Sequence, residues 1–226
     1  MFMQEITQDQ LNSFRAPAFP GSFFLSFEGI EGAGKSSQIK AIKEYLEEAN
    51  FNVIILREPG GTAFGERLRK AILETSSELH PVAEAHLFAA SRAQLLEEVV
   101  LTELSNPGTV IICDRYLDST IAYQGLARGL GVKTVLDIHS IFPLNLVPHK
   151  TIYLKISIET SQNRQRVRNS PKDYFERQGE TFYRQLIKGY DEAYKLFPER
   201  ISLIDGEKGF THVHNLIKEQ IDSLIL

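Results

Sequence analysis

Short, continuously apolar runs alternate along this chain with longer segments in which apolar residues recur every three or four positions. The short runs are typical of strands covered on both faces, and the longer segments are typical of amphipathic helices. The predicted strands are 22–28, 52–56, 109–113, 151–156 and 201–204. The predicted helices are 34–49, 63–74, 81–104, 117–127, 132–141, 158–168, 178–196 and 210–224, with a loop at 169–176.

Strands that alternate with helices predict an α/β fold, with a five-stranded parallel sheet, right-handed connections and helices on both faces. The 226 residues suffice for one such domain, which we place at 22–226. Residues 1–21 end in Ala16-Pro17-Ala18-Phe19-Pro20-Gly21, which predicts a loosely packed N-terminal extension. Ligands of such sheets bind at the carboxyl ends of the strands, so we look there for the site.

The segment from Phe23 to Ser36 joins the first predicted strand to the first helix and contains the pattern GxxxxGKS. Glycines let backbone N–H groups surround a pair of phosphates, Lys35 supplies positive charge to them, and the Ser36 hydroxyl can bind an accompanying Mg²⁺. A chance glycine-rich turn is the alternative, but the flanking strand and helix are the context that a phosphate-binding loop requires. The residues expected to bind a nucleoside triphosphate are Gly29, Ile30, Glu31, Gly32, Ala33, Gly34, Lys35, Ser36 and Ser37.

Charge and cysteine content narrow the classes of partner and location. The formal net charge is −4, the pI is near 5.9 and no basic block occurs, so we expect no nucleic-acid partner and no membrane partner. No apolar run approaches the length of a membrane span, and the first residues lack the apolar stretch of a signal peptide. The single cysteine, Cys113, has apolar neighbours, which predicts an unreactive buried thiol and a reducing, cytoplasmic location.

Phe88 and Arg92 lie at positions i and i+4 of a predicted helix and therefore share one of its faces. A flat ring beside a guanidinium can bind a nucleobase, by stacking and by a hydrogen bond to a ring carbonyl. The alternative is a core phenylalanine beside a solvated arginine, and the residue pattern leaves both interpretations open.

Asp114 and Arg115 directly follow a buried strand, where charged side chains are costly unless they have partners. A site for phosphate and Mg²⁺ would supply those partners, and we expect Ser36 and Asp114 to hold the metal. The segment Arg57 to Thr62, with Arg69 beyond it, is a further polar cluster at the same predicted edge.

These motifs together resemble those of the thymidylate kinase family. The resemblance runs from about residue 23 to the C-terminus and rests on FEGIEGAGKS, REPGGT, LFAASR, DRYLDSTIAYQG and DYFE, in that order. It implies a P-loop NTPase fold like that of nucleoside monophosphate kinases. It also implies transfer of the γ-phosphoryl group of ATP to dTMP, with Mg²⁺ as cofactor, and a homodimer.

The resemblance also implies individual roles. Phe88 would stack on thymine, Arg92 would bond its O4, and Tyr123 would crowd the 2′ position of the sugar. The residues placed around dTMP are Glu58, Arg69, Phe88, Arg92, Arg115, Thr120, Tyr123 and Gln124. The residues given a catalytic role are Glu31, Lys35, Arg115, Arg164 and Arg168.

Arg164 and Arg168 belong to a basic segment that the resemblance identifies as a lid, at about 161–178. Some members of the family carry a catalytic arginine in the phosphate loop and others carry it in the lid. The loop here has none, so the chain resembles the bacterial-type group with lid arginines. Many such members have Asp-Arg-Ile-Glu where this chain has Asp173-Tyr174-Phe175-Glu176, which leaves the choice of lid arginine open. A solvated helix end is the other interpretation of these charges.

Other functions remain to be weighed against this one. A kinase for a deoxynucleoside or another nucleoside monophosphate would share most of these motifs. A regulatory GTP switch would need DxxG and NKxD, and the sequence contains neither. An inactive, ATP-dependent interaction protein would not need Glu31, Lys35, Ser36 and Arg115. The long segment 81–104 could form a dimer contact or part of the core.

Overall fold

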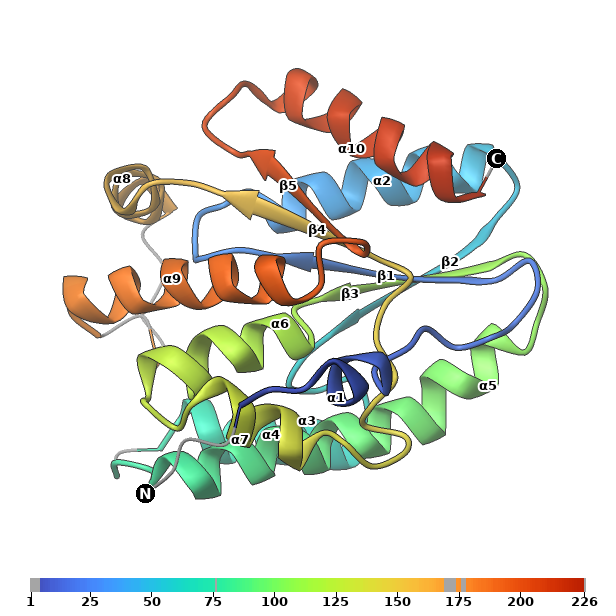
Figure 1. The fold of residues 1–226 in the computed structure, drawn as a ribbon. Coiled ribbons are helices and arrows are strands. Elements are labelled where there is room, and N and C mark those ends of the chain that lie inside the picture. Colours follow the sequence, from blue (N-terminus) through green and yellow to red (C-terminus); the bar gives the residue numbers. More distant parts are fainter. Residues whose placement is uncertain (1–4, 76, 169–173, 176–177, 226) are drawn as a thin grey trace.

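The computed structural model describes residues 5–75, 77–168, 174–175 and 178–225. Five parallel strands form one sheet in the order β2-β3-β1-β4-β5 (Figure 1). The strands are β1 (Phe23–Glu28), β2 (Asn52–Arg57), β3 (Thr109–Asp114), β4 (Lys150–Lys155) and β5 (Ile201–Asp205). The predicted α/β class and sheet are confirmed, and every predicted strand is present to within one residue at each end.

Helices connect the strands in sequence and cover both faces of the sheet. Figure 1 shows α2 (Lys35–Glu48) and α10 (Phe210–Ile225) on one face. The remaining helices, apart from α8 (Ile158–Arg168) at the carboxyl edge, lie on the other face. They are α1 (Gln8–Asn12), α3 (Ala63–Leu73), α4 (Pro81–Leu95), η1 (Leu96–Val100), α5 (Leu101–Leu104), α6 (Leu117–Thr120), η2 (Ile121–Ala127), α7 (Val132–Ile138) and α9 (Glu180–Leu196).

The core lies where the central strands are covered on both sides. β1, β3 and β4 are buried along almost their whole length, which their continuous apolar sequences predict. α2 packs its buried Ile39, Ile42 and Leu46 against the sheet and also contacts α10. This packing fixes the β1–α2 connection, and with it the GxxxxGKS loop, at the centre of the carboxyl edge.

The predicted helix 81–104 is present as the continuous run α4–η1–α5, whose middle part has π-helical hydrogen bonds. The predicted helix 117–127 is likewise α6 followed by the π-helical η2. π-helical turns often occur at functional sites. α7 ends at Ile138, earlier than the predicted residue 141, and Pro143 follows shortly after it. The capping residue, His139, is fully buried and its Nε2 lies 2.8 Å from Nη1 of Arg92, so a contact with a distant residue fixes the point where the chain leaves the helix.

The N-terminal residues pack more closely than the sequence predicts. Phe14 is buried, and its ring centroid lies 5.9 Å from that of Phe197. The backbone of Arg15 pairs with that of Leu146. The short helix α1, capped by the Thr7 hydroxyl, was not predicted. The expectation of a loosely packed extension is therefore wrong for this segment, because Phe14 adds to the apolar core.

Within the described part of the chain, no helix has both the length and the apolar character needed to cross a bilayer.

Candidate functional site

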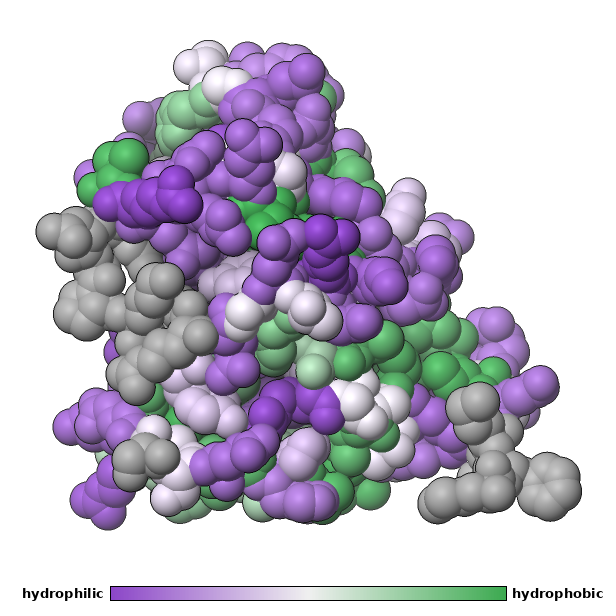
Figure 2. Space-filling view, turned by 90° about the vertical axis from the view of Figure 1, so that its left-hand side faces the viewer, coloured by the Kyte–Doolittle hydropathy of each residue, from purple (hydrophilic) through white to green (hydrophobic). Residues whose placement is uncertain are grey.

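A cavity of about 470 Å³ opens at the carboxyl edge of the sheet. Figure 2 views the molecule from that side and shows mostly hydrophilic residues around a smaller hydrophobic area. Most of the residues singled out from the sequence line this one cavity. They are Glu31, Gly32, Ala33, Gly34, Lys35, Ser36, Ser37, Glu58, Arg69, Phe88, Arg92, Asp114, Arg115, Thr120, Tyr123, Gln124 and Arg164.

The GxxxxGKS loop forms one wall of the cavity and depends on its glycines. Gly29 has φ +138°, and a Cβ there would lie 2.5 Å from the carbonyl oxygen of Leu154. Gly34, with φ +95°, is the N-cap of α2 and offers no side chain to the first turn. The N–H groups of that turn are therefore available to an anion, which the positive end of the helix dipole also favours.

Lys35 begins α2, and its ammonium group folds back over the loop. Its Nζ donates to the carbonyl oxygen of Gly29 at 3.0 Å, and it lies 3.4 Å from that of Ile30. Burial, and then the nearby Arg115 guanidinium, lower the pKa of Lys35. A phosphate group would compensate both effects, because it supplies negative charge where two cations face one cavity.

Arg115 lies between the loop and the rest of the cavity. Its backbone has φ +71°, a left-handed conformation that is uncommon outside glycine. Its Nη1 donates to the Gly29 carbonyl at 3.1 Å and to the Tyr190 hydroxyl at 2.8 Å. Its Nη2 lies 3.5 Å from a carboxylate oxygen of Glu31, and its guanidinium lies over the ring of Tyr123 at 5.2 Å. The guanidinium is thus held from several sides while it faces the cavity.

Glu28, the last residue of β1, lies directly behind Arg115 and is fully buried. It accepts a hydrogen bond from the backbone N–H of Tyr116 at 2.7 Å and one from the Ser119 hydroxyl at 2.6 Å. Burial, together with the negative charge of Asp118, raises the pKa of Glu28 to about 8. Ser119 also lies 2.8 Å from the Tyr190 hydroxyl, so these polar groups form one continuous network behind the cavity.

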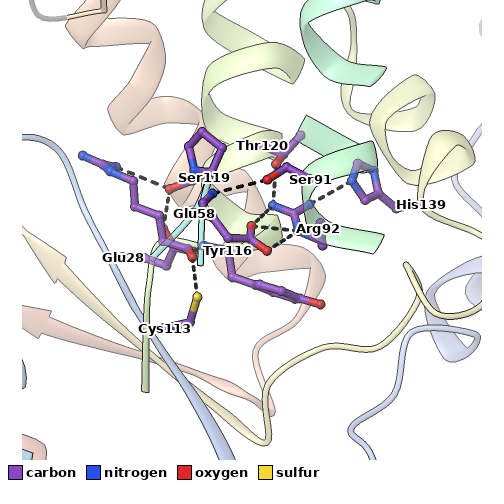
Figure 3. A network of polar contacts seen from close by, with 12 residues as sticks. Glu28, Glu58, Ser91, Arg92, Cys113, Tyr116, Ser119, Thr120 and His139 are labelled. Atoms are coloured by element: carbon purple, nitrogen blue, oxygen red, sulfur yellow. Dashed lines mark hydrogen bonds and ion pairs between the residues drawn. The ribbon is translucent and has the colours of Figure 1, made fainter. Parts of the chain in front are cut away.

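A second network surrounds Arg92 at the far wall of the cavity (Figure 3). The Arg92 side chain is only 1% exposed and forms an ion pair with the buried Glu58. Its Nη2 donates to the Thr120 hydroxyl at 3.0 Å, and its Nη1 lies 2.8 Å from Nε2 of His139. The interpretation of Arg92 as a solvated arginine, which the sequence left open, is therefore wrong.

His139 is an acceptor in this network. Its Nδ1 donates to the Val135 carbonyl at 2.8 Å, so Nε2 carries the lone pair that receives the N–H of Arg92. Burial, and then the charge of Arg92, lower the pKa of His139 to about 3. The imidazole therefore stays neutral, and it holds one N–H of Arg92 Nη1 away from the cavity.

Aromatic rings form the wall beside Arg92. Phe88 is half-buried and lies on the same side of α4 as Arg92. Its ring centroid lies 6.3 Å from that of Phe175. Phe175 also contacts Tyr123 edge-to-face at 5.2 Å. Phe88 is thus a cavity residue, and the alternative of a core phenylalanine is wrong. Phe175 lines the cavity as well, although the sequence gave it no role.

Gln124 is held by a buried carboxylate. Its Nε2 donates to Glu84 Oε1 at 2.7 Å, while the other oxygen of Glu84 lies 3.3 Å from Nε of Arg128. Gln124 is fully buried from solvent, and its Oε1 has no hydrogen-bond partner among the described residues. That oxygen is therefore the polar atom of Gln124 left for a ligand.

α8 brings Arg164 to the cavity beside the loop. Its Nη1 donates to the Gly32 carbonyl and its Nη2 to the Gly206 carbonyl, both at 3.0 Å. The side chain of Arg168 and much of the predicted lid, 161–178, lie outside the described residues. Of the segment DYFE, the structure describes Tyr174 and Phe175.

Ser36 and Asp114 line the same cavity, which suits the predicted Mg²⁺. Oδ1 of Asp114 is buried and has no hydrogen-bond partner among the described residues, so it can accept one from metal-bound water. No cluster of three or more metal-binding side chains occurs in the described part of the chain. That is compatible with Mg²⁺, which proteins usually bind through one or two side chains together with substrate phosphates.

Several cavity neighbours were not singled out from the sequence as functional. Ser119 stands within the DRYLDST motif, so its position gave a signal. Tyr190, His139 and Glu84 gave none, because each is a single polar residue in an otherwise ordinary helical pattern. Only their contacts with Arg115, Arg92 and Gln124 connect them to the cavity.

Comparison with known proteins agrees with this geometry. The family model described as thymidylate kinase matches residues 27–217. A thymidylate kinase of Thermoanaerobacter sp. (strain X514) is 41% identical over 191 residues, which cover 84% of this chain and 93% of the relative. One of Chlorobaculum tepidum is 40% identical, covering 88% and 97%. The crystal structure of thymidylate kinase from Ehrlichia chaffeensis superposes with a TM-score of 0.69 at 28% identity, covering 89% of this chain and 99% of that one.

Proposed function

Because this chain belongs to the thymidylate kinase family, we propose that it transfers the γ-phosphoryl group of ATP to dTMP, giving dTDP and ADP. The observation that carries this proposal is the shared cavity. It places the phosphate-binding loop, Arg115 and the pair Phe88 and Arg92 around one space. A phosphate oxygen of dTMP would attack the γ-phosphorus, and the bond to the oxygen that bridges the β- and γ-phosphates would break.

The donor end of the cavity is the loop. Its free backbone N–H groups would bind the β- and γ-phosphates of ATP, with Lys35 as the mobile cation. When phosphate is bound, the ammonium group can exchange its contact with the Gly29 carbonyl for phosphate oxygens. Phosphoryl transfer passes through a loose transition state with charge on the equatorial oxygens, so this positive charge lowers the barrier.

The acceptor end of the cavity would bind dTMP. Phe88 would stack on the base, Arg92 and Gln124 would contact its polar edge, and Tyr123 would lie beside the sugar. Arg115 would hold the acceptor phosphate next to the loop. The acceptor oxygen is already nucleophilic, so the reaction needs no nucleophilic side chain. The protein instead supplies position and charge.

Arg164 would act from the lid side. It already contacts the Gly32 carbonyl in the loop, so its guanidinium lies beside the proposed phosphate site. A cation there would stabilise the charge of the transferred phosphoryl group, and closure of the surrounding segment would exclude water. We assign Arg168 the same kind of role as an alternative.

Mg²⁺ is the cofactor that these residues would hold, through the Ser36 hydroxyl and through Asp114. When bound with ATP, Mg²⁺ neutralises part of the phosphate charge. Ser36 is exposed at the start of α2, and Asp114 is at the carboxyl end of β3, so both reach the cavity from the sheet edge. Asp114 would act through Oδ1, which has no hydrogen-bond partner in the described part of the chain.

We also propose that the chain forms a homodimer through the surface of α3 and α4. These two helices pack against each other and leave Phe64, Val82 and Ala90 exposed. The predicted alternative, that the apolar residues of 81–104 form core, holds for Leu95 but not for Val82 and Ala90. Sedimentation analysis of the intact chain, and of Phe64→Glu, would test the dimer.

An ADP-release assay with Mg²⁺ and ATP tests the proposed reaction across thymidine, dTMP, dUMP, dCMP and UMP. We expect the highest kcat/KM with dTMP. A preference for thymidine would instead indicate a nucleoside kinase, and a preference for dCMP or UMP would indicate a kinase for another monophosphate. ATP hydrolysis that no acceptor stimulates would contradict the proposal.

A further inference from the structure

Glu84 lies outside the proposed catalytic machinery, yet it is a fully buried carboxylate close to the cavity. It sits on α4, before Phe88 and Arg92, and does not line the cavity itself. Its contacts are the Gln124 amide at 2.7 Å and the Arg128 guanidinium at 3.3 Å. A buried carboxylate is costly, so its place here needs an explanation beyond packing.

The contact with Glu84 decides which end of the Gln124 amide faces the ligand. An ionised carboxylate can only accept hydrogen bonds, so the amide must present its NH₂ group to Glu84. Burial raises the pKa of Glu84 above its usual value, while the Gln124 amide and then the Arg128 guanidinium favour the ionised form. The amide oxygen of Gln124 is left without a partner among the described residues.

Arg92 contributes the complementary donor. A guanidinium carries five N–H donors. In Arg92, the donors on Nε and Nη2 are directed to Glu58 and Thr120, and Nη1 gives one to His139. Nη1 keeps a second N–H. Arg92 is bound to Thr120, which stands one turn before Gln124 on the α6–η2 helix. The second N–H of Nη1 and the amide oxygen of Gln124 therefore lie at the same end of the cavity.

We propose that Glu84 is a positioning residue that fixes the Gln124 amide, so that the site selects a pyrimidine with an N–H beside a carbonyl over an aminopyrimidine. Thymine presents a carbonyl acceptor and an adjacent N–H donor, which match Arg92 and the oxygen of Gln124. Cytosine presents an amino donor and a ring-nitrogen acceptor, so both contacts are mismatched. This inference rests on the proposed function, because it concerns the acceptor of the same reaction.

The variant Glu84→Gln tests the inference. A glutamine there can accept from the Gln124 amide or donate to it, so the amide can turn over. We expect the ratio of kcat/KM for dTMP to kcat/KM for dCMP to fall at least about tenfold, because buried groups that read a polar edge dominate such discrimination. The matched control is Glu98→Gln, which changes an exposed carboxylate that also accepts from a glutamine, Gln94, on the same helical run. Its ratio should equal that of the unchanged protein.

A purely structural role for Glu84 would lower kcat/KM for both acceptors alike and leave the ratio unchanged, which would overturn the inference. If Glu84→Gln does not fold, Gln124→Met decides the question, because it removes the amide and keeps the length of the side chain. That variant should show the same loss of ratio, and an unchanged ratio would overturn the inference. Failure of the unchanged protein to phosphorylate dTMP would instead defeat the proposed function, so the two failures are distinguishable.

Discussion

The phenolic oxygen of Tyr190 lies 2.8 Å from Nη1 of Arg115 and 2.8 Å from the hydroxyl of Ser119. Tyr190 belongs to α9 and Arg115 follows β3, so the contact joins two elements far apart in the sequence. Ser119 in turn donates to Glu28 at the end of β1. The guanidinium proposed to hold the acceptor phosphate is therefore oriented by groups from three elements.

This relationship predicts the effect of Tyr190→Phe. The change removes one hydrogen bond to Arg115, which contributes about 0.5–1.5 kcal/mol. We expect kcat/KM for dTMP to fall roughly two- to tenfold. The change in KM for ATP should be smaller, because the Tyr190 hydroxyl reaches the loop only through a contact of 3.4 Å with the Gly29 carbonyl. Steady-state kinetics with each substrate varied in turn would measure this. Tyr194→Phe, at a more exposed position of the same helix, is the control. An equal loss for both substrates would show that Tyr190 acts through overall stability.

Lys35→Ala tests the donor end of the cavity. Because the ammonium group is proposed to contact the β- and γ-phosphates, its loss should lower kcat/KM by at least ~10²-fold, the scale for one electrostatic donor in an active site. Lys40→Ala, at an exposed position of α2, is the control. Turnover by Lys35→Ala close to that of the unchanged protein would show that the loop does not bind the transferred phosphate.

Phe88→Ala tests the base pocket. Stacking of a base on an aromatic ring contributes about 1–3 kcal/mol, so we expect the affinity for dTMP to weaken by that amount. Calorimetry with dTMP alone separates this binding from the reaction. Phe210→Ala removes an exposed ring from α10, away from the cavity and from the proposed dimer surface, and should leave the affinity unchanged. Unchanged affinity in a folded Phe88→Ala protein would place the base elsewhere.

Glu28 predicts a dependence of stability on pH. Its pKa is about 8 in the folded chain, against 4.5 for a free side chain, so the folded state binds its proton more tightly than the unfolded state does. The stabilisation by this proton is complete below about pH 4.5 and is lost as the pH rises through about 8. We expect the free energy of unfolding of the unchanged protein, relative to Glu28→Gln, to fall between these values. Urea unfolding at several pH values would measure it, and a parallel pH dependence of the two proteins would contradict it.

The sequence predicts those features of the fold that depend on residues close together in the chain, and it misses those that depend on distant contacts. Apolar runs and their spacing predict the strands, because a strand covered on both faces has little choice of residue. Cys113 is buried as predicted, because its apolar neighbours in β3 are a local signal. Burial raises the pKa of its thiol well above the usual value. The predictions for the end of α7 and for the packing around Phe14 were wrong, since both features depend on contacts with distant residues.

The candidate site likewise contains residues that the sequence predicts and supporting contacts that it does not. The residues of the loop and of the DRYLDST segment stand together in the sequence, so their motifs point to the edge of the sheet. The supporting contacts join different elements, as His139 does with Arg92 and Glu84 does with Gln124. No spacing along the chain encodes such pairs, and only the folded structure brings them together.

Arg164→Ala tests the proposed role of the lid arginine. The guanidinium donates to the Gly32 carbonyl and to the Gly206 carbonyl, and this places its charge beside the loop before any substrate binds. An arginine that stabilises the charge of a transferring phosphoryl group contributes 10³ or more in kcat in related phosphoryl-transfer enzymes. We expect kcat to fall by at least ~10²-fold while KM for dTMP changes little, because the base and sugar contacts are elsewhere.

Arg166→Ala is the matched control, since Arg166 is exposed on the same helix and does not line the cavity. Single-turnover measurements would separate the chemical step from product release. If Arg164→Ala keeps its rate and Arg168→Ala loses it, the positive charge that stabilises the transferring group comes from Arg168. Arg164 then serves only to join α8 to the loop. If both variants keep the rate of the chemical step, the proposed role of these arginines is wrong, and the positive charge of Lys35 and Arg115 suffices.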